Sequence, residues 1–138
     1  YGSNWNDLPN SRLLQSQKNI FPVYGRDYAD VLSRSKICLS FLSKMNRDVY
    51  TRRCFEIPAT KKLLLCERTK ELQDMFVENK EAVYFSDRFE LLEKVNWLLK
   101  NPEQIHEIAE AGFQRVYENG DDVKTRAENL LTIIKEIH

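Results

Sequence analysis

Histidine, cysteine and glycine are scarce in this sequence, which limits the chemistry that its 138 residues can support. One of the two histidines is the terminal residue His138, so no zinc site of the usual histidine and cysteine composition is expected. The three cysteines, Cys38, Cys54 and Cys66, have apolar neighbours and no CxxC spacing. We expect them to be reduced thiols of the core, as is usual in the cytoplasm.

Net charge and long apolar runs are also missing. The 21 basic and 21 acidic residues cancel, whereas a nucleic-acid-binding protein usually carries a basic surplus, so no nucleic-acid partner is expected. No apolar run approaches the roughly 18 residues that span a bilayer. The first ten residues lack the charged and apolar regions of a signal peptide. These features predict a cytoplasmic protein without a membrane span.

The common fingerprints of catalysis and cofactor binding do not occur. Neither GxGxxG nor GxxxxGK[ST] is found, so the usual dinucleotide and P-loop sites are not expected. His106 falls within a predicted helix and is interpreted as a solvated residue rather than a catalytic one. Asp121 and Asp122 follow a helix-ending Asn-Gly pair and are better explained as the capping acids of the next helix. No cofactor and no metal site are therefore predicted.

The predicted strands and helices alternate along the chain. We expect short strands near 19–25, over 36–42, 62–66 and 81–85, and helices over 26–35, 51–56, 69–76 and from Asp87 to the C-terminus, the last broken by "NP" at 101 and "NG" at 119. "KLLLC" shows no alternation of polar and apolar residues, which is typical of a parallel strand covered on both faces. The predicted fold is α/β: one Rossmann-like domain over 1–138, its parallel sheet flanked by helices and its C-terminal helices packed on it.

Candidate site residues lie where strands end. Open parallel sheets bind ligands beyond the carboxyl ends of their strands, and the loop "SKMNRD" and the segment around "KLLLC" occupy such places. Asp48, Arg53 and Glu56 are expected to cluster around a short helix there. Spacing alone leaves two interpretations open, because Arg53 and Glu56 could equally form an exposed intrahelical ion pair worth about 0.3 kcal/mol.

A longer stretch of sequence carries a family resemblance. "RCFEIPATKKLLLCERTKELQDMF" resembles the C-terminal, nucleotide-sugar-binding domain of group 1 GT-B glycosyltransferases, in particular the spore-maturation CgeB-like group. The likeness extends through "NKEAVYFSDRFELLEKVNWLLKNPEQIHEIAEAGFQRVYENGDDVKTRAENLL" and back to "YGSNW". It therefore covers essentially the whole chain.

The resemblance implies a function and assigns roles to residues. It implies a hexosyltransferase-type domain that binds a UDP-, GDP- or similar nucleotide sugar without a metal. Glu56 would accept hydrogen bonds from the ribose hydroxyls, and Arg53 would contact the diphosphate. Asp48, separated from Glu56 by seven residues, would face the donor sugar, and Gly2 and Ser3 would bring backbone N–H groups to the phosphates. Asp48 and Arg53 are the catalytic candidates.

The resemblance also implies a partner. In such enzymes the acceptor site lies on an N-terminal domain, so we expect this chain to work with such a domain and to transfer nothing by itself. Thr60-Lys61-Lys62 departs from the family pattern, which has glycine in this turn. A non-catalytic Rossmann-like scaffold module is the alternative, and a flavodoxin-like signalling domain is a weaker third.

Overall fold

The computed structural model describes residues 22–137, which divide into two units between Arg34 and Ser35. The first unit contributes one described helix, α2 (Gly25–Arg34), in which Asp30 pairs with Arg34 at 2.8 Å. Residues 22–24 form no strand. The strand expected near 19–25 is therefore absent from its described part, as Pro22 would favour.

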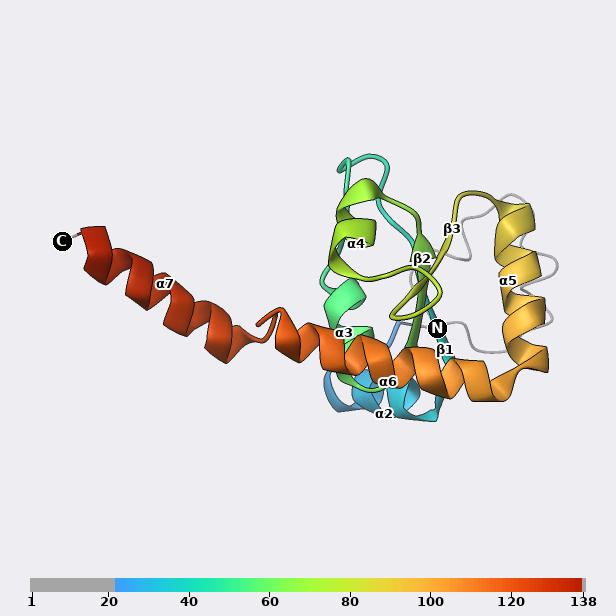
Figure 1. Cartoon of the computed structure of the whole chain (residues 1–138). Coiled ribbons are helices and arrows are strands. Elements are labelled where there is room, and N and C mark those ends of the chain that lie inside the picture. Colours follow the sequence, from blue (N-terminus) through green and yellow to red (C-terminus); the bar gives the residue numbers. More distant parts are fainter. Residues whose placement is uncertain (1–21, 138) are drawn as a thin grey trace. The chain divides into compact units, whose positions relative to one another are not determined.

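The second unit contains a small parallel sheet and the remaining helices. Its elements are β1 (Ile37–Ser40), α3 (Arg53–Ala59), β2 (Leu63–Glu67), α4 (Lys70–Met75), β3 (Val83–Phe85), α5 (Arg88–Lys100), α6 (Pro102–Glu118) and α7 (Val123–Ile137). The three strands lie in the order β1-β2-β3, and both pairings are parallel (Figure 1). The predicted α/β class is confirmed; β1 and β3 are three and two residues shorter than expected, and β2 has the expected length but begins one residue later.

The central strand β2 is buried on both faces. Leu63 and Leu65 belong to the core that α5 and α6 build on one face of the sheet. Cys66 points to the other face, where its β3 neighbour Tyr84 donates a buried hydrogen bond of 2.8 Å to the Leu72 carbonyl of α4. In Figure 1, α5 lies on one side of the strands and α3 and α4 on the other. This double cover explains why "KLLLC" lacks alternation, and it buries all three cysteines as free thiols.

Helix α3 ends just after its internal proline. Pro58 is fully buried, and the helix stops at Ala59, as expected of a residue that lacks an N–H. The chain then turns through Lys61, whose φ of 56° lies in the left-handed region. This conformation costs a residue other than glycine about 1 kcal/mol, and it leads the chain from α3 into β2.

The helices that follow the sheet begin and end at the predicted residues. Asp87 caps α5 by accepting from the N–H groups of Phe89 and Glu90 at 2.7 and 2.9 Å. Asn101 stands at the start of α6, but its side chain donates to a carbonyl of α5 instead of capping α6. Gly112 lets α6 approach closely, because a Cβ there would lie 2.4 Å from the Glu81 carbonyl oxygen.

The predicted packing of the C-terminal helices on the sheet holds for α5 and α6, whereas α7 buries none of its described side chains. Asp122 caps α7 by accepting from the Thr125 N–H at 3.0 Å, as expected. The exposed apolar residues of α7 are Val123, Leu130, Leu131, Ile133, Ile134 and Ile137. Within residues 22–137, no helix is both long and apolar enough to cross a bilayer.

Candidate functional site

Two adjoining pockets lie at the carboxyl ends of the three strands. The first has a volume of about 280 Å³ and is lined by Leu42, Ser43, Lys44, Asp48, Glu67, Arg68, Thr69, Phe85 and Ser86. The second, of about 510 Å³, is lined by Phe41, Lys44, Glu67, Phe85, Ser86, Asp87, Arg88, Phe89 and Leu91. Parallel α/β sheets bind ligands at this end of their strands.

The loop after β1 is held against the end of β2. Glu67, the last residue of β2, accepts a hydrogen bond of 2.7 Å from the Leu42 N–H. Asp48 closes the loop on itself by accepting from the Ser43 N–H at 3.3 Å, while its own N–H donates to the Ser43 carbonyl at 3.1 Å. These bonds fix the wall of the first pocket that carries Lys44 and Asp48.

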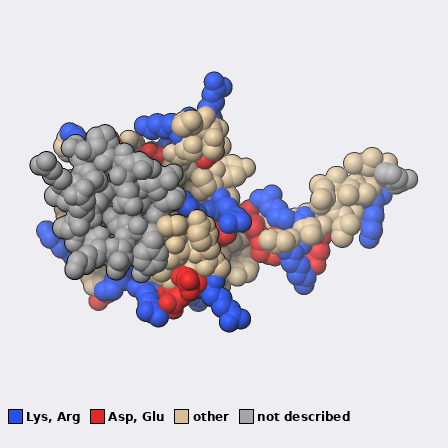
Figure 2. All heavy atoms as spheres, turned by 180° about the vertical axis from the view of Figure 1, so that it is seen from behind, with Lys and Arg blue, Asp and Glu red and all other residues tan. Residues whose placement is uncertain are grey.

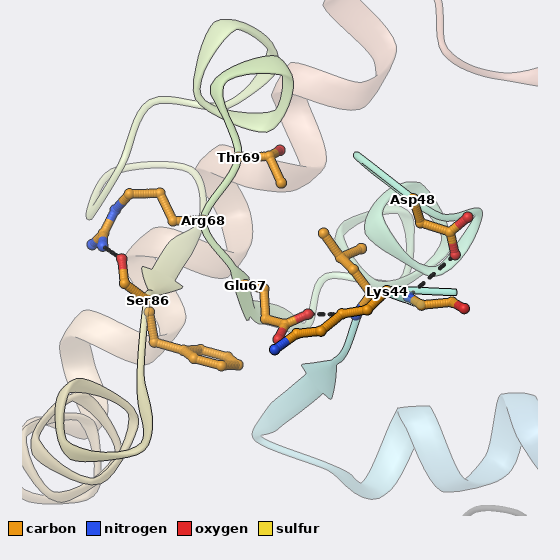
Figure 3. A pocket seen from close by; sticks show the side chains of 9 residues that line it. Lys44, Asp48, Glu67, Arg68, Thr69 and Ser86 are labelled. Atoms are coloured by element: carbon orange, nitrogen blue, oxygen red, sulfur yellow. Dashed lines mark hydrogen bonds between the residues drawn. The ribbon is translucent and has the colours of Figure 1, made fainter. Parts of the chain in front are cut away.

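Arg68, directly after β2, is committed to protein contacts. Its guanidinium donates to Glu78 at 2.7 Å and to Glu90 at 2.6 Å, and also to the Ser86 hydroxyl. In Figure 3 its side chain turns away from Lys44 and Asp48 toward Ser86. Arg68 therefore stabilises the ends of β2 and β3 and is not a cation that a ligand can readily recruit.

These contacts change the acidity of the two carboxyl groups. The hydrogen bonds from Arg68 hold the pKa of Glu90 down at about 2 and lower the pKa of Glu78. Glu90 gains a further hydrogen bond of 2.8 Å from the Ser86 N–H. Both carboxylates therefore stay ionised at neutral pH, and the pKa of Arg68 is raised in return.

Of the predicted site residues that the structure describes, Asp48 is the one that lines a pocket. Arg53 is the first residue of α3 and is exposed. Glu56 lies in the first turn of α3, and the ion pair that the structure shows for it joins Arg52, one helical turn earlier, at 2.7 Å. Residues three and four apart both share a helix face, so this exposed pair is of the same kind as the intrahelical pair with Arg53 that the spacing left open. Arg53 and Glu56 line neither pocket.

The chain path nevertheless brings Asp48, Arg53 and Glu56 to one end of the sheet. All three lie on the connection that leaves the carboxyl end of β1, and α3 begins on that connection. Because β1 and β2 are parallel, this connection must return to the opposite end before β2 starts, so the first turn of α3 faces the strand ends. Gly2 and Ser3 lie outside the described residues.

Among the pocket residues that sequence reasoning did not name as site residues are Lys44, Glu67, Arg88 and Phe89. A signal was present for the first two, since polar residues that follow a buried strand mark the carboxyl end of a sheet. No such signal marks Arg88 and Phe89, and only the fold places them beside the end of β1.

The charges of the described surface are mixed. On the described part of the face in Figure 2, acidic and basic side chains are interspersed. Between residues 22 and 137, no three histidine, cysteine or carboxylate side chains are grouped so that they could hold a metal ion. His106 is exposed on α6, as predicted.

Comparison with known proteins adds one finding to this geometry. A family model described as "Glycosyl transferase-like" matches residues 1–132, nearly the whole chain. No match was found among the curated proteins or among the solved structures.

Proposed function

The chain belongs to the glycosyl transferase-like family, and from this premise we propose that it is the nucleotide-sugar donor-binding domain of a glycosyltransferase. The observation that carries the proposal is the pair of pockets at the carboxyl ends of the strands, with Asp48 and Lys44 in the wall of the first. Glycosyl transfer needs a place that receives a diphosphate and a sugar together. This end of the sheet is the place in such folds where ligands collect.

The proposal gives each candidate residue a role. Glu56 binds the ribose hydroxyls, because an ionised carboxylate accepts two vicinal O–H groups. Arg53 contacts the diphosphate and stabilises the charge that develops on it as it leaves. Asp48 faces the reacting end of the sugar, and Gly2 and Ser3 supply backbone N–H groups. An N-terminal domain of the same protein supplies the acceptor, as in CgeB-like relatives, and the reaction is independent of metal.

The conformation of Lys61 favours this proposal over a scaffold module. The departure from glycine at residues 60–62 would support a degenerate, non-catalytic module if it displaced α3 from β2. Lys61 instead takes up the left-handed conformation, and its ammonium pairs with Glu110 at 2.9 Å. The connection that carries Asp48 and Glu56 therefore leaves α3 packed against β2.

Calorimetry with UDP, GDP and ADP tests the proposal. One of these nucleotides should bind, and Glu56→Ala should weaken binding about tenfold while the fold is kept. Glu128→Ala on α7 is the matched control and should leave the affinity unchanged. Absence of binding for all three nucleotides at millimolar concentration would contradict the proposal and favour the scaffold module.

A further inference from the structure

The second pocket combines aromatic rings with polar groups. Phe41 and Phe85 meet edge to face with ring centroids 5.7 Å apart. Phe89, on the first turn of α5, is 67% exposed beside them. A phenyl ring left in water at the mouth of a pocket offers a flat apolar surface to a ligand.

The two cations of this pocket, Lys44 and Arg88, differ from Arg68 in their surroundings. Among the described residues, no carboxylate pairs with Lys44 or Arg88, and the Arg88 guanidinium lies 4.6 Å from the centroid of the Phe89 ring. This contact places the guanidinium, whose fork suits a carboxylate, over the ring. Arg68 in the neighbouring pocket shows the opposite arrangement, because two glutamates already occupy it.

The acids of the pocket are bound by the protein itself. Glu67 accepts from the Leu42 N–H, and Asp87 accepts from two N–H groups at the start of α5. These N–H groups partly offset the negative charge of the two acids, whereas no described carboxylate offsets the positive charge of Lys44 and Arg88. Each acid still has lone pairs that can accept from a sugar hydroxyl.

The pockets are continuous through shared residues. Lys44, Glu67 and Ser86 line both, and Asp48 lines the first (Figure 3). A sugar whose reacting end lies near Asp48 can therefore extend past Lys44 into the second pocket.

We propose that the second pocket binds the sugar of the donor and that this sugar carries a carboxylate, as a hexuronic acid does. The C–H face of the ring lies on Phe89, its hydroxyls donate to Asp87 and Glu67, and its carboxylate pairs with Arg88 and Lys44. This inference rests on the proposed function, and it names the class of sugar that the same site takes.

Nucleotide sugars that differ at one carbon test the inference. Calorimetry compares UDP with UDP-glucose and UDP-glucuronic acid, and GDP with GDP-mannose and GDP-mannuronic acid. In the series whose nucleotide binds, the acidic sugar should bind about tenfold more tightly than the neutral one. Arg88→Gln should remove this preference and leave the affinity for the free diphosphate unchanged. Phe89→Ser should weaken both nucleotide sugars without affecting the diphosphate.

Arg126→Gln on α7 is the matched control, and amide spectra confirm that each variant is folded. Equal affinity for the acidic and neutral sugars would overturn the inference while the proposed function stands. Loss of diphosphate binding in Arg88→Gln would also overturn it, because the cation would then serve the phosphates. If no nucleotide and no nucleotide sugar binds, the proposed function fails, and the inference fails with it.

Discussion

Helices α6 and α7 have similar apolar patterns but different surroundings. In α6, apolar residues three and four apart are buried, and they are Ile105, Ile108, Ala109, Gly112 and Val116. In α7 the same spacing leaves Leu130, Ile134 and Ile137 exposed, and no described side chain of the helix is buried. The pattern predicts that a helix has an apolar face, but a partner for that face must come from the rest of the structure.

The largest expected effect in this comparison is at Gly112, where α6 comes close to the Glu81 carbonyl oxygen. Gly112→Val should lower the free energy of unfolding by about 3 kcal/mol, because its Cβ would lie 2.4 Å from the Glu81 carbonyl oxygen. Ala127→Val on the exposed surface of α7 should change it by less than about 0.5 kcal/mol. Urea unfolding followed by circular dichroism measures both. Equal effects would contradict the difference between the two helices.

A matched pair of isoleucines sharpens the comparison. Ile108 on α6 is 2% exposed and Ile134 on α7 is 46% exposed. Ile108→Ala should destabilise the chain by about 3 kcal/mol through the cavity that it leaves, and Ile134→Ala by less than about 1 kcal/mol. The same urea titrations measure both free energies of unfolding. A large decrease in Ile134→Ala would mean that α7 packs on another part of the folded chain, which would contradict the comparison.

A polar clamp of Arg68, Glu78 and Glu90 holds the start of α5 together with the apolar contact of Leu91, and the clamp should respond to acid. Because Arg68 lowers the pKa of Glu90 to about 2, the stabilisation is present above the unfolded pKa near 4.5. It is then lost as the pH falls from there toward 2. We expect a loss of about 2 kcal/mol over this range. Arg68→Met should lower the stability at neutral pH and flatten its dependence on pH between 5 and 2. An unchanged slope would show that the clamp does not couple protonation to folding.

The smallest effect concerns two surface lysines. Lys61 pairs with Glu110 of α6 and lies 4.5 Å from the centroid of the Phe113 ring, so Lys61→Ala should cost about 0.5–1 kcal/mol. Lys124 pairs with Glu128 within α7 at 3.9 Å and is highly exposed, so Lys124→Ala should have no measurable effect. Thermal unfolding in low salt compares the two variants. The effect of Lys61→Ala should become smaller when salt is added, whereas a salt-independent loss would point to packing alone.

Local signals predicted much of the fold. The unbroken apolar run of β2, the Asp87 cap, Pro102 and Gly120 each act within a few residues, and the structure places helix and strand ends at them. The carboxyl end of β1 and the loop with Asp48 follow from the same local reasoning.

The rest of the candidate site depends on residues far apart in the sequence. Lys44 meets Arg88 and Phe89 in one pocket because α5 begins at the carboxyl end of β3, which lies in the same parallel sheet as β1, and no spacing along the chain encodes this. The partner of Glu56 depended on the start of α3, since a helix that begins at Arg53 places Arg52 one turn before Glu56. Burial of α6 but not α7 is likewise a property of the assembled fold.

An amide NMR titration of the chain with UDP, GDP and ADP tests the central claim most directly. The account predicts that one nucleotide shifts amide signals of residues 42–56 and 67–69 and that signals of α7 stay in place. Shifts that spread evenly over the chain would contradict a nucleotide site at the carboxyl ends of the strands, and so would a well-folded spectrum that no nucleotide changes.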